Sequence, residues 1–182
     1  MTTIAARFAG VGMAPLPGFA LAACIALAAM ALLGADAAPL RRLAIPVEGV
    51  GAAALRDAFA DDRPGHSHEA IDIPAARGTP VRAADDGTLV KLFTSDAVGL
   101  TIYQFDPDQR FAYAYAHLDR YAAGLVEGMP LRRGDVIGYV GSTGNASPDA
   151  PHLHFAIFEL GPEKHWWQGT AINPYPLLTD SR

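Results

Sequence analysis

The sequence has little charge, few lysines and almost no cysteine. Only 18% of its 182 residues are charged, with 14 Lys plus Arg against 19 Asp plus Glu and a formal net charge of -5. No Lys or Arg run exceeds two residues, which argues against nucleic acid as a partner. The single cysteine, Cys24, excludes disulfides, thiol nucleophiles and thiolate metal sites from the rest of the chain.

A disordered composition is also absent. Hydrophobic residues make up 51% of the chain and the mean hydropathy is +0.15. Low hydrophobicity with high net charge is what keeps a chain unfolded, and neither applies here. The length predicts one domain plus a short extension.

The first residues have the pattern of an export segment. From Gly18 to Gly34 the chain carries no charge, and small residues follow up to Ala37. This predicts a signal peptide cleaved after Ala37, with a retained membrane anchor as the alternative. The run LAAC, ending at Cys24, also has the form of a lipoprotein cleavage box, but the residues after it stay apolar.

These features predict three parts of the chain. Residues 1–37 are expected to form the signal peptide or N-terminal anchor, 38–49 a linker or a first edge segment, and 50–182 the folded domain. The protein is therefore expected in the periplasm or elsewhere in the cell envelope, with membrane attachment through the N-terminal segment as an alternative.

From Thr79 onward the chain reads as short strands separated by turns. The β-like runs are TPVRA, GTLVKLF, GLTIYQF, RFAYAYAHL, VIGYVG and HLHFAIF. Asp-Gly and Asp-Pro-Asp sequences between them mark hairpins and bends. The pattern predicts an all-β fold, a compact antiparallel two-sheet or partly open barrel domain with an active-site groove.

The first candidate site is HEAID, His68 to Asp72. On an extended strand the two side chains would lie about 13 Å apart, too far to share one ion. The chain must therefore bend between them, and a metal bound to both would explain the bend. The alternative is a solvated loop histidine followed by an aspartate at a strand start.

The second is HLHF, His152 to Phe155. Alternation on a strand places His152 and His154 on one face and Leu153 and Phe155 on the other, toward the core. Two imidazoles about 6.6 Å apart could place one nitrogen on an ion and the other on a water molecule.

The third is YAHL, which ends at Leu118. Period two places Phe111, Tyr113, Tyr115 and His117 on one face as an aromatic row that ends in a histidine. On its own this row is expected to be core, and beside a substrate it would instead form the floor of a groove.

Taken together, HxxxD, YAHL, GSTGN and HLHF resemble the lysostaphin-type (LytM-type) zinc metallopeptidases, bacterial endopeptidases that cut cell-wall peptide crosslinks. The resemblance extends to LRDAFADDR, DIPAARGTPVRAADDGTLV, GDVIGYVGSTG and NPYPLL, and covers roughly Val50 to Leu178. The chain departs from the family in one place, since Ala70 stands where HxGxD often has glycine.

The resemblance implies a role for each motif residue. His68, Asp72 and His154 match the three ligands of one zinc ion per chain, and His117 and His152 match the catalytic pair. Zinc with three protein ligands keeps an open position for water. The implied substrates are peptidoglycan stem peptides and their crosslinks, either Gly-Gly bridges or D-alanyl bonds to a diamino acid, with a protein outside the cell wall as a further alternative.

Two other histidines lie outside this pattern. His66 is expected at the surface, because the spacing to Asp72 fits the family only from His68. His165 belongs to no motif, and the neighbouring Trp166 and Trp167 either close the core or line the rim of a groove.

Two other functions compete with that of a zinc endopeptidase. A lipoyl- or biotinyl-like carrier needs a lysine at a hairpin tip, and neither Lys91 nor Lys164 lies in such a turn. A catalytically inactive relative that binds the cell wall and activates amidases is the stronger alternative. Such relatives usually lack ligands or catalytic histidines, whereas this chain keeps all five residues.

Overall fold

The structure is a computed structural model that describes residues 41–63 and 65–179. The expected signal or anchor segment, 1–37, lies outside the described residues. Within the described ranges, no helix combines the length and apolar character needed to cross a membrane.

The described residues form eleven strands, one 3-10 helix and one short α-helix. In chain order they are η1 (Ala52–Ala54), β1 (Asp62–Arg63), β2 (His66–Ser67), β3 (Ile71–Pro74), β4 (Pro80–Arg82), β5 (Gly87–Ser95), β6 (Gly99–Phe105), β7 (Phe111–Tyr121), β8 (Pro130–Leu131), β9 (Val136–Val140), β10 (His152–Leu160), β11 (Gly169–Ile172) and α2 (Tyr175–Thr179).

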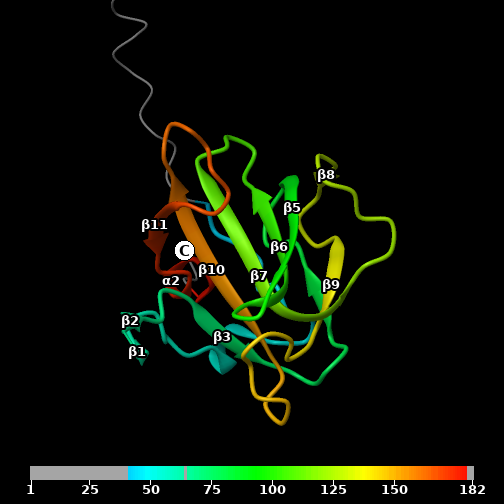
Figure 1. Cartoon of the computed structure of the whole chain (residues 1–182), viewed down its shortest axis with the longest axis vertical. Helices are drawn as coiled ribbons and strands as arrows, with labels where there is room; N and C mark the ends of the chain where they lie inside the picture. Colours follow the sequence, from blue (N-terminus) through cyan, green and yellow to red (C-terminus); the bar gives the residue numbers. More distant parts are fainter. Residues whose placement is uncertain (1–40, 64, 180–182) are drawn as a thin grey trace, which may run out of the picture. The chain divides into compact units, whose positions relative to one another are not determined.

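Nine of these strands form one antiparallel sheet, in the order β11-β10-β7-β6-β5-β8, with β3 paired to β10 and β9 joining β4 to β7. The remaining two strands, β1 and β2, form a small hairpin. Figure 1 shows the long strands β7 and β10 side by side through the middle of the domain. The sheet is not closed into a barrel, and the prediction of an all-β antiparallel fold is confirmed.

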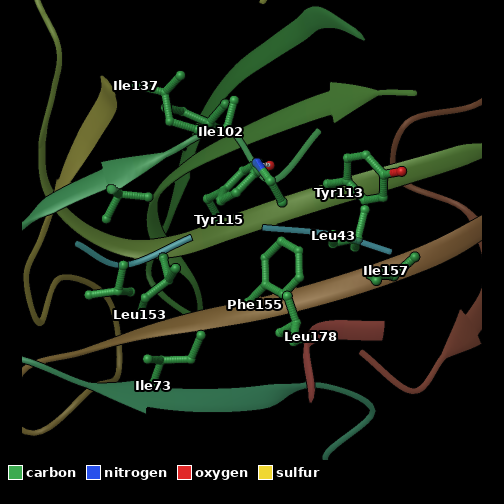
Figure 2. Close-up of a cluster of buried hydrophobic side chains, with 14 of the residues drawn as sticks. Leu43, Ile73, Ile102, Tyr113, Tyr115, Ile137, Leu153, Phe155, Ile157 and Leu178 are labelled. Carbon is green, nitrogen blue, oxygen red and sulfur yellow. Dashed lines mark hydrogen bonds between the residues drawn. The ribbon is translucent and has the colours of Figure 1, made fainter. Parts of the chain in front are cut away.

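The alternation of side chains along β7 and β10 builds the core. Tyr113 and Tyr115 of β7 and Phe155 of β10 are buried on the inner face of the sheet, and the Tyr115 and Phe155 ring centroids lie 5.2 Å apart. Figure 2 shows these rings packed among aliphatic side chains from β3, β6, β9 and α2. The tyrosines are therefore core residues.

The stretch before η1 packs against the domain. Leu43 and Val47 are buried in the main core, and Val47 forms a β-bridge with Val81. Of the two expectations for this stretch, a linker or a first edge segment, these contacts fit the edge segment.

The hydroxyl of Tyr115 carries a buried hydrogen-bond network. It donates to Oε1 of Gln104 at 2.8 Å and accepts from the backbone N–H of Ala84 at 2.9 Å. The Gln104 amide in turn donates to the Asp85 carbonyl at 2.7 Å. This network ties β7 to β6 and to the turn before β5.

We expect Tyr115→Phe to lower the free energy of unfolding by about 1–3 kcal/mol, because it leaves buried partners without a hydrogen bond. Urea denaturation measures the change. The control is Tyr139→Phe, in which the ring under the Arg120 guanidinium is retained. Equal stability of Tyr115→Phe and the wild type would show that the network contributes nothing net.

Candidate metal centre and its two neighbouring histidines

Strand β10, which carries HLHF, pairs with β3 and with β7 and so brings the HEAID and YAHL motifs together. His154 lies opposite Asp72 of β3 on one side and opposite Ala116 of β7 on the other. His68 enters from the turn before β3, where Glu69 has a φ of 55°. This is the bend that HEAID predicts, and it places the His68 ring beside Asp72.

The three side chains converge on one point. Nε2 of His68 lies 3.1 Å from Oδ1 of Asp72 and 3.2 Å from Nδ1 of His154, and Oδ1 and Nδ1 are 3.1 Å apart. Three ligands about 2.0–2.1 Å from a tetrahedral zinc ion lie about 3.3 Å from one another. His68, Asp72 and His154 could therefore hold a metal ion together.

The hydrogen-bond chemistry of His68 also fits a cation. Its Nδ1 lies 3.1 Å from the Ala58 carbonyl, which only accepts, so Nδ1 carries the ring hydrogen. In the neutral ring, Nε2 then presents a lone pair toward the Asp72 carboxylate, with no hydrogen between them. A cation at the centre of the triangle gives these facing lone pairs a partner.

Burial and charge set the protonation of the site. Burial lowers the pKa of His68 and of His117 below the ordinary value of 6.5. Partial burial acts to raise the pKa of Asp72, but the hydrogen bond from His154 and the charges of the nearby histidines outweigh it and hold that pKa well below its ordinary value. At neutral pH the site therefore offers a neutral imidazole at His68 and an ionised carboxylate at Asp72, the forms that bind a metal.

His117 and His152 lie beside the three converging residues. The His117 ring centroid is 5.1 Å from that of His152 and 5.6 Å from that of His154. Nδ1 of His117 is 2.8 Å from the Thr143 carbonyl, and Nδ1 of His152 is 2.8 Å from the Ala150 carbonyl. Each Nδ1 thus carries the hydrogen, and each Nε2 is left to accept or donate a proton.

The face predicted for His117 is wrong. Strict alternation would place it with Tyr113 and Tyr115 toward the core, yet its ring contacts His152 and His154 on the opposite face. The backbone at His117 has a φ of 59°, and the pairing of β7 with β6 shifts register nearby. This left-handed residue turns the side chain to the other face of the sheet.

The turn from Gly141 to Asn145 positions His117 and His152. The Gly141 carbonyl accepts a hydrogen bond from the His152 backbone N–H at 3.1 Å, and the Thr143 carbonyl holds His117. A Cβ on Gly141 would lie 2.3 Å from the Asp119 nitrogen, so only glycine fits there.

Arg63 is a contact of the site that the motifs do not reveal. Its Nη2 donates to Oδ2 of Asp72 at 2.9 Å, while Oδ1 faces the two imidazoles. Arg63 comes from β1, and the β1–β2 hairpin pairs it with His66. The only sequence signal is its place at the end of LRDAFADDR, because the contact depends on how the hairpin folds back.

The other two histidines do not join this group. His66 is exposed on β2, and its neighbour two residues on, His68, is the one that meets Asp72. His165 lies in the loop between β10 and β11, where its ring stacks on Trp167. Both placements agree with the sequence-based expectation that neither belongs to the motif set.

Comparison with known proteins places these motifs within one family. The sequence model of the family described as Peptidase family M23 matches residues 66–174 of this chain. An L-Ala--D-Glu endopeptidase of Bacillus subtilis is 32% identical over 116 residues, which cover 61% of this chain and 34% of that protein. The glycyl-glycine endopeptidase ALE-1 of Staphylococcus capitis is 33% identical over 115 residues, which cover 63% of this chain and 30% of that protein. The chain thus spans about a third of the length of these relatives.

Solved structures give the same result. The catalytic domain of lysostaphin from Staphylococcus simulans superposes with a TM-score of 0.55 at 32% identity, over 64% of this chain and 82% of that one. Csd3 of Helicobacter pylori superposes with a TM-score of 0.59 at 25% identity, over 78% of this chain and 36% of that one.

We expect Arg63→Ala to weaken metal binding by about 10- to 100-fold, the usual loss when a residue that orients a ligand is removed. Competition with a chromogenic zinc chelator measures the affinity without an assay of activity. Arg56→Ala is the matched control, since Arg56 pairs with Asp61 in the same segment. Tighter binding in Arg63→Ala would mean that repulsion between the guanidinium and the cation outweighs orientation.

Proposed function

Because the chain belongs to peptidase family M23, we propose that it is a zinc-dependent endopeptidase that hydrolyses peptide crosslinks of bacterial cell-wall peptidoglycan. One observation carries the proposal: His68, Asp72 and His154 meet in a triangle of 3.1–3.2 Å, directly beside two further imidazoles. Two nitrogens and one carboxylate oxygen with an open fourth position are a typical catalytic zinc set.

The metal and the histidines divide the chemistry. When bound, a zinc ion supplies Lewis acidity and makes water nucleophilic near neutral pH. One of His117 and His152 takes a proton at Nε2 from the attacking water. The other, when it carries a proton on Nε2 as well as on Nδ1, steadies the developing oxyanion or protonates the leaving amine. Neither histidine forms a covalent bond with the substrate.

The carbonyls of Thr143 and Ala150 fix which nitrogen does this work. Because each accepts from Nδ1, the reacting atom in both rings is Nε2. Nε2 of His152 lies 3.7 Å from Oδ1 of Asp72, so the reacting nitrogen of this ring borders the three converging residues.

The scissile bond and the location are part of the same proposal. Peptidoglycan as the substrate requires export, for which residues 1–37 have the expected composition. Gly-Gly bridges and D-alanyl bonds to a diamino acid are both candidates. Export, together with an Arg-rich, Lys-poor and Ala-rich composition typical of a GC-rich genome, favours D-alanyl crosslinks in a thin periplasmic wall. Digestion of purified sacculi followed by mass spectrometry of the released fragments identifies the bond.

A binding-only role as an amidase activator is the alternative. The presence and contact of all five residues favour the enzyme, since binding alone needs neither a base nor an open metal position. A protein that holds zinc, cuts no crosslinked peptide and accelerates an amidase would establish the alternative instead.

We expect the purified chain to carry one zinc ion, with His154→Ala losing both metal and activity. His117→Ala should keep the metal and lose activity by about 10²- to 10⁴-fold, the usual contribution of a general acid or base. Metal analysis and hydrolysis of a soluble crosslinked peptide measure the two properties separately.

His66→Ala, two residues from His68, serves as the control for that pair and should retain metal and activity. Loss of zinc from His117→Ala as complete as that from His154→Ala would overturn the division of roles. Full activity without any divalent metal would overturn the proposal itself.

We expect the rate to fall on the acid side with its midpoint below pH 6.5. With His117 as the base of the pair, its ring must be neutral to accept a proton, and burial lowers its pKa from 6.5, so it stays neutral to a lower pH than a free imidazole. Below the midpoint kcat/KM should drop about tenfold per pH unit. Zinc content is measured at each pH, and zinc that leaves in step with the rate would assign the loss to the ligands instead.

A further inference from the structure

The loop between β10 and β11 presents an aromatic ring to solvent. Trp167 is 61% exposed, and Val126 is the only other large apolar side chain that is so exposed in the described part of the chain. The loop lies at the end of β10 far from His152, at the top of the domain in Figure 1. None of the five residues of the proposed hydrolytic site lies in this loop.

Trp167 is held in place by other rings. It stacks on His165 with centroids 4.5 Å apart and planes at 18°, and meets Trp166 edge to face at 5.2 Å. Trp166 packs in turn on Tyr103 at 4.7 Å and on Phe93 at 5.3 Å. The indole is therefore anchored to β5 and β6, and binding a ligand would cost little side-chain entropy.

A hollow adjoins this ring. It has a volume of about 310 Å³, at the small end of the range for ligand sites. His165 belongs both to the hollow and to the stack on Trp167. The polar side chains that line it offer both donors and acceptors: Glu159, Glu163, Lys164, His165, Gln168 and Thr170.

The loop and the metal centre share one face of the sheet. His154, Ala156 and Phe158 alternate on that face of β10, and Phe158 and Trp166 both pack against the buried cluster of Phe105, Ala112 and Leu160. From His154 to Phe158 the strand advances about 13 Å. Alanines occupy the strand positions between them on this face, at Ala114 and Ala156.

We propose that Trp167 and the adjoining hollow bind a sugar ring of the peptidoglycan glycan strand. A pyranose ring has an apolar C–H face that packs on an aromatic ring, and hydroxyl and amide groups around its edge that need donors and acceptors. Trp167 supplies the first and the hollow supplies the second. The inference rests on the proposed function, since it takes the glycan from the same substrate.

The spacing supports this occupant. The stem peptide joins the sugar to the crosslink, and about four extended residues span about 13–14 Å. With the stem peptide laid along β10, a crosslink at the metal centre therefore places the sugar about as far along the strand as Phe158, toward the end where the loop that carries Trp167 begins. A protein partner fits less well, because a single exposed indole surrounded by charged groups is not a contiguous apolar patch.

The test uses glycan strands from which an amidase has removed all stem peptides, together with the full chain. We expect the wild type to bind these strands and Trp167→Ala to bind about tenfold more weakly, equivalent to about 1.4 kcal/mol. Trp167→Phe keeps a ring and should recover most of the binding. Val126→Ala, which removes the other exposed apolar side chain, should bind like the wild type.

Hydrolysis of glycan-free crosslinked peptides is measured in parallel and should be unchanged in Trp167→Ala. No binding by the wild type, or equal binding by Trp167→Ala, would overturn the glycan site. So would a loss of glycan-free hydrolysis in a folded Trp167→Ala, which would assign the indole to the hydrolytic site. If no variant cuts glycan-free peptides while glycan binding still depends on Trp167, the proposed hydrolysis fails and the glycan site stands.

Discussion

The register of β10 between β3 and β7 is the constraint on which the rest of the structure depends. It places His154 opposite Asp72 and Leu153 opposite Ile73, so the polar pair faces outward and the aliphatic pair joins the core. A slip of one residue would exchange the two faces, bury both histidines and expose Leu153 and Phe155. The core and the site are thus specified by the same pairing, and the hydrophobic cost of a slip protects the geometry of the metal centre.

A second constraint is the concentration of lone pairs at one point. His68 donates its only hydrogen to Ala58, so its Nε2 faces the Asp72 carboxylate without a donor between them. Such an arrangement is unfavourable unless a cation or an extra proton fills it. The hydrogen bond from Arg63 to the other oxygen of Asp72 partly neutralises the carboxylate and fixes which oxygen faces the imidazoles. The pairing of β3 with β10 therefore sets Asp72 beside His154, and the turn before β3 brings His68 to them.

Much of the fold and site followed from the sequence because both depend on period-two patterns. The run GLTIYQF coincides with β6, and HLHFAIF with the first seven residues of β10. The sequence pattern does not predict the short elements β1, β8, β11 and α2, because a run of two to five residues is too short to show a period. His117 was placed on the wrong face because a single left-handed residue reverses the alternation. A contact made by a hairpin or a backbone atom leaves no motif in the sequence. The sequence therefore does not reveal the roles of Arg63 and of the carbonyls of Ala58, Thr143 and Ala150.

One strand also sets the distance between the two ends of the sheet face. β10 begins with the histidines of the metal centre and leads into the loop that carries Trp167. Paired to β7 on one side and to β3 and β11 on the other, it has little freedom to stretch or bend. A ligand that contacts both the candidate metal centre and the base of this loop must therefore match the length of the strand between them. A rigid strand of this kind suits a ligand whose two contacting groups are themselves a fixed distance apart.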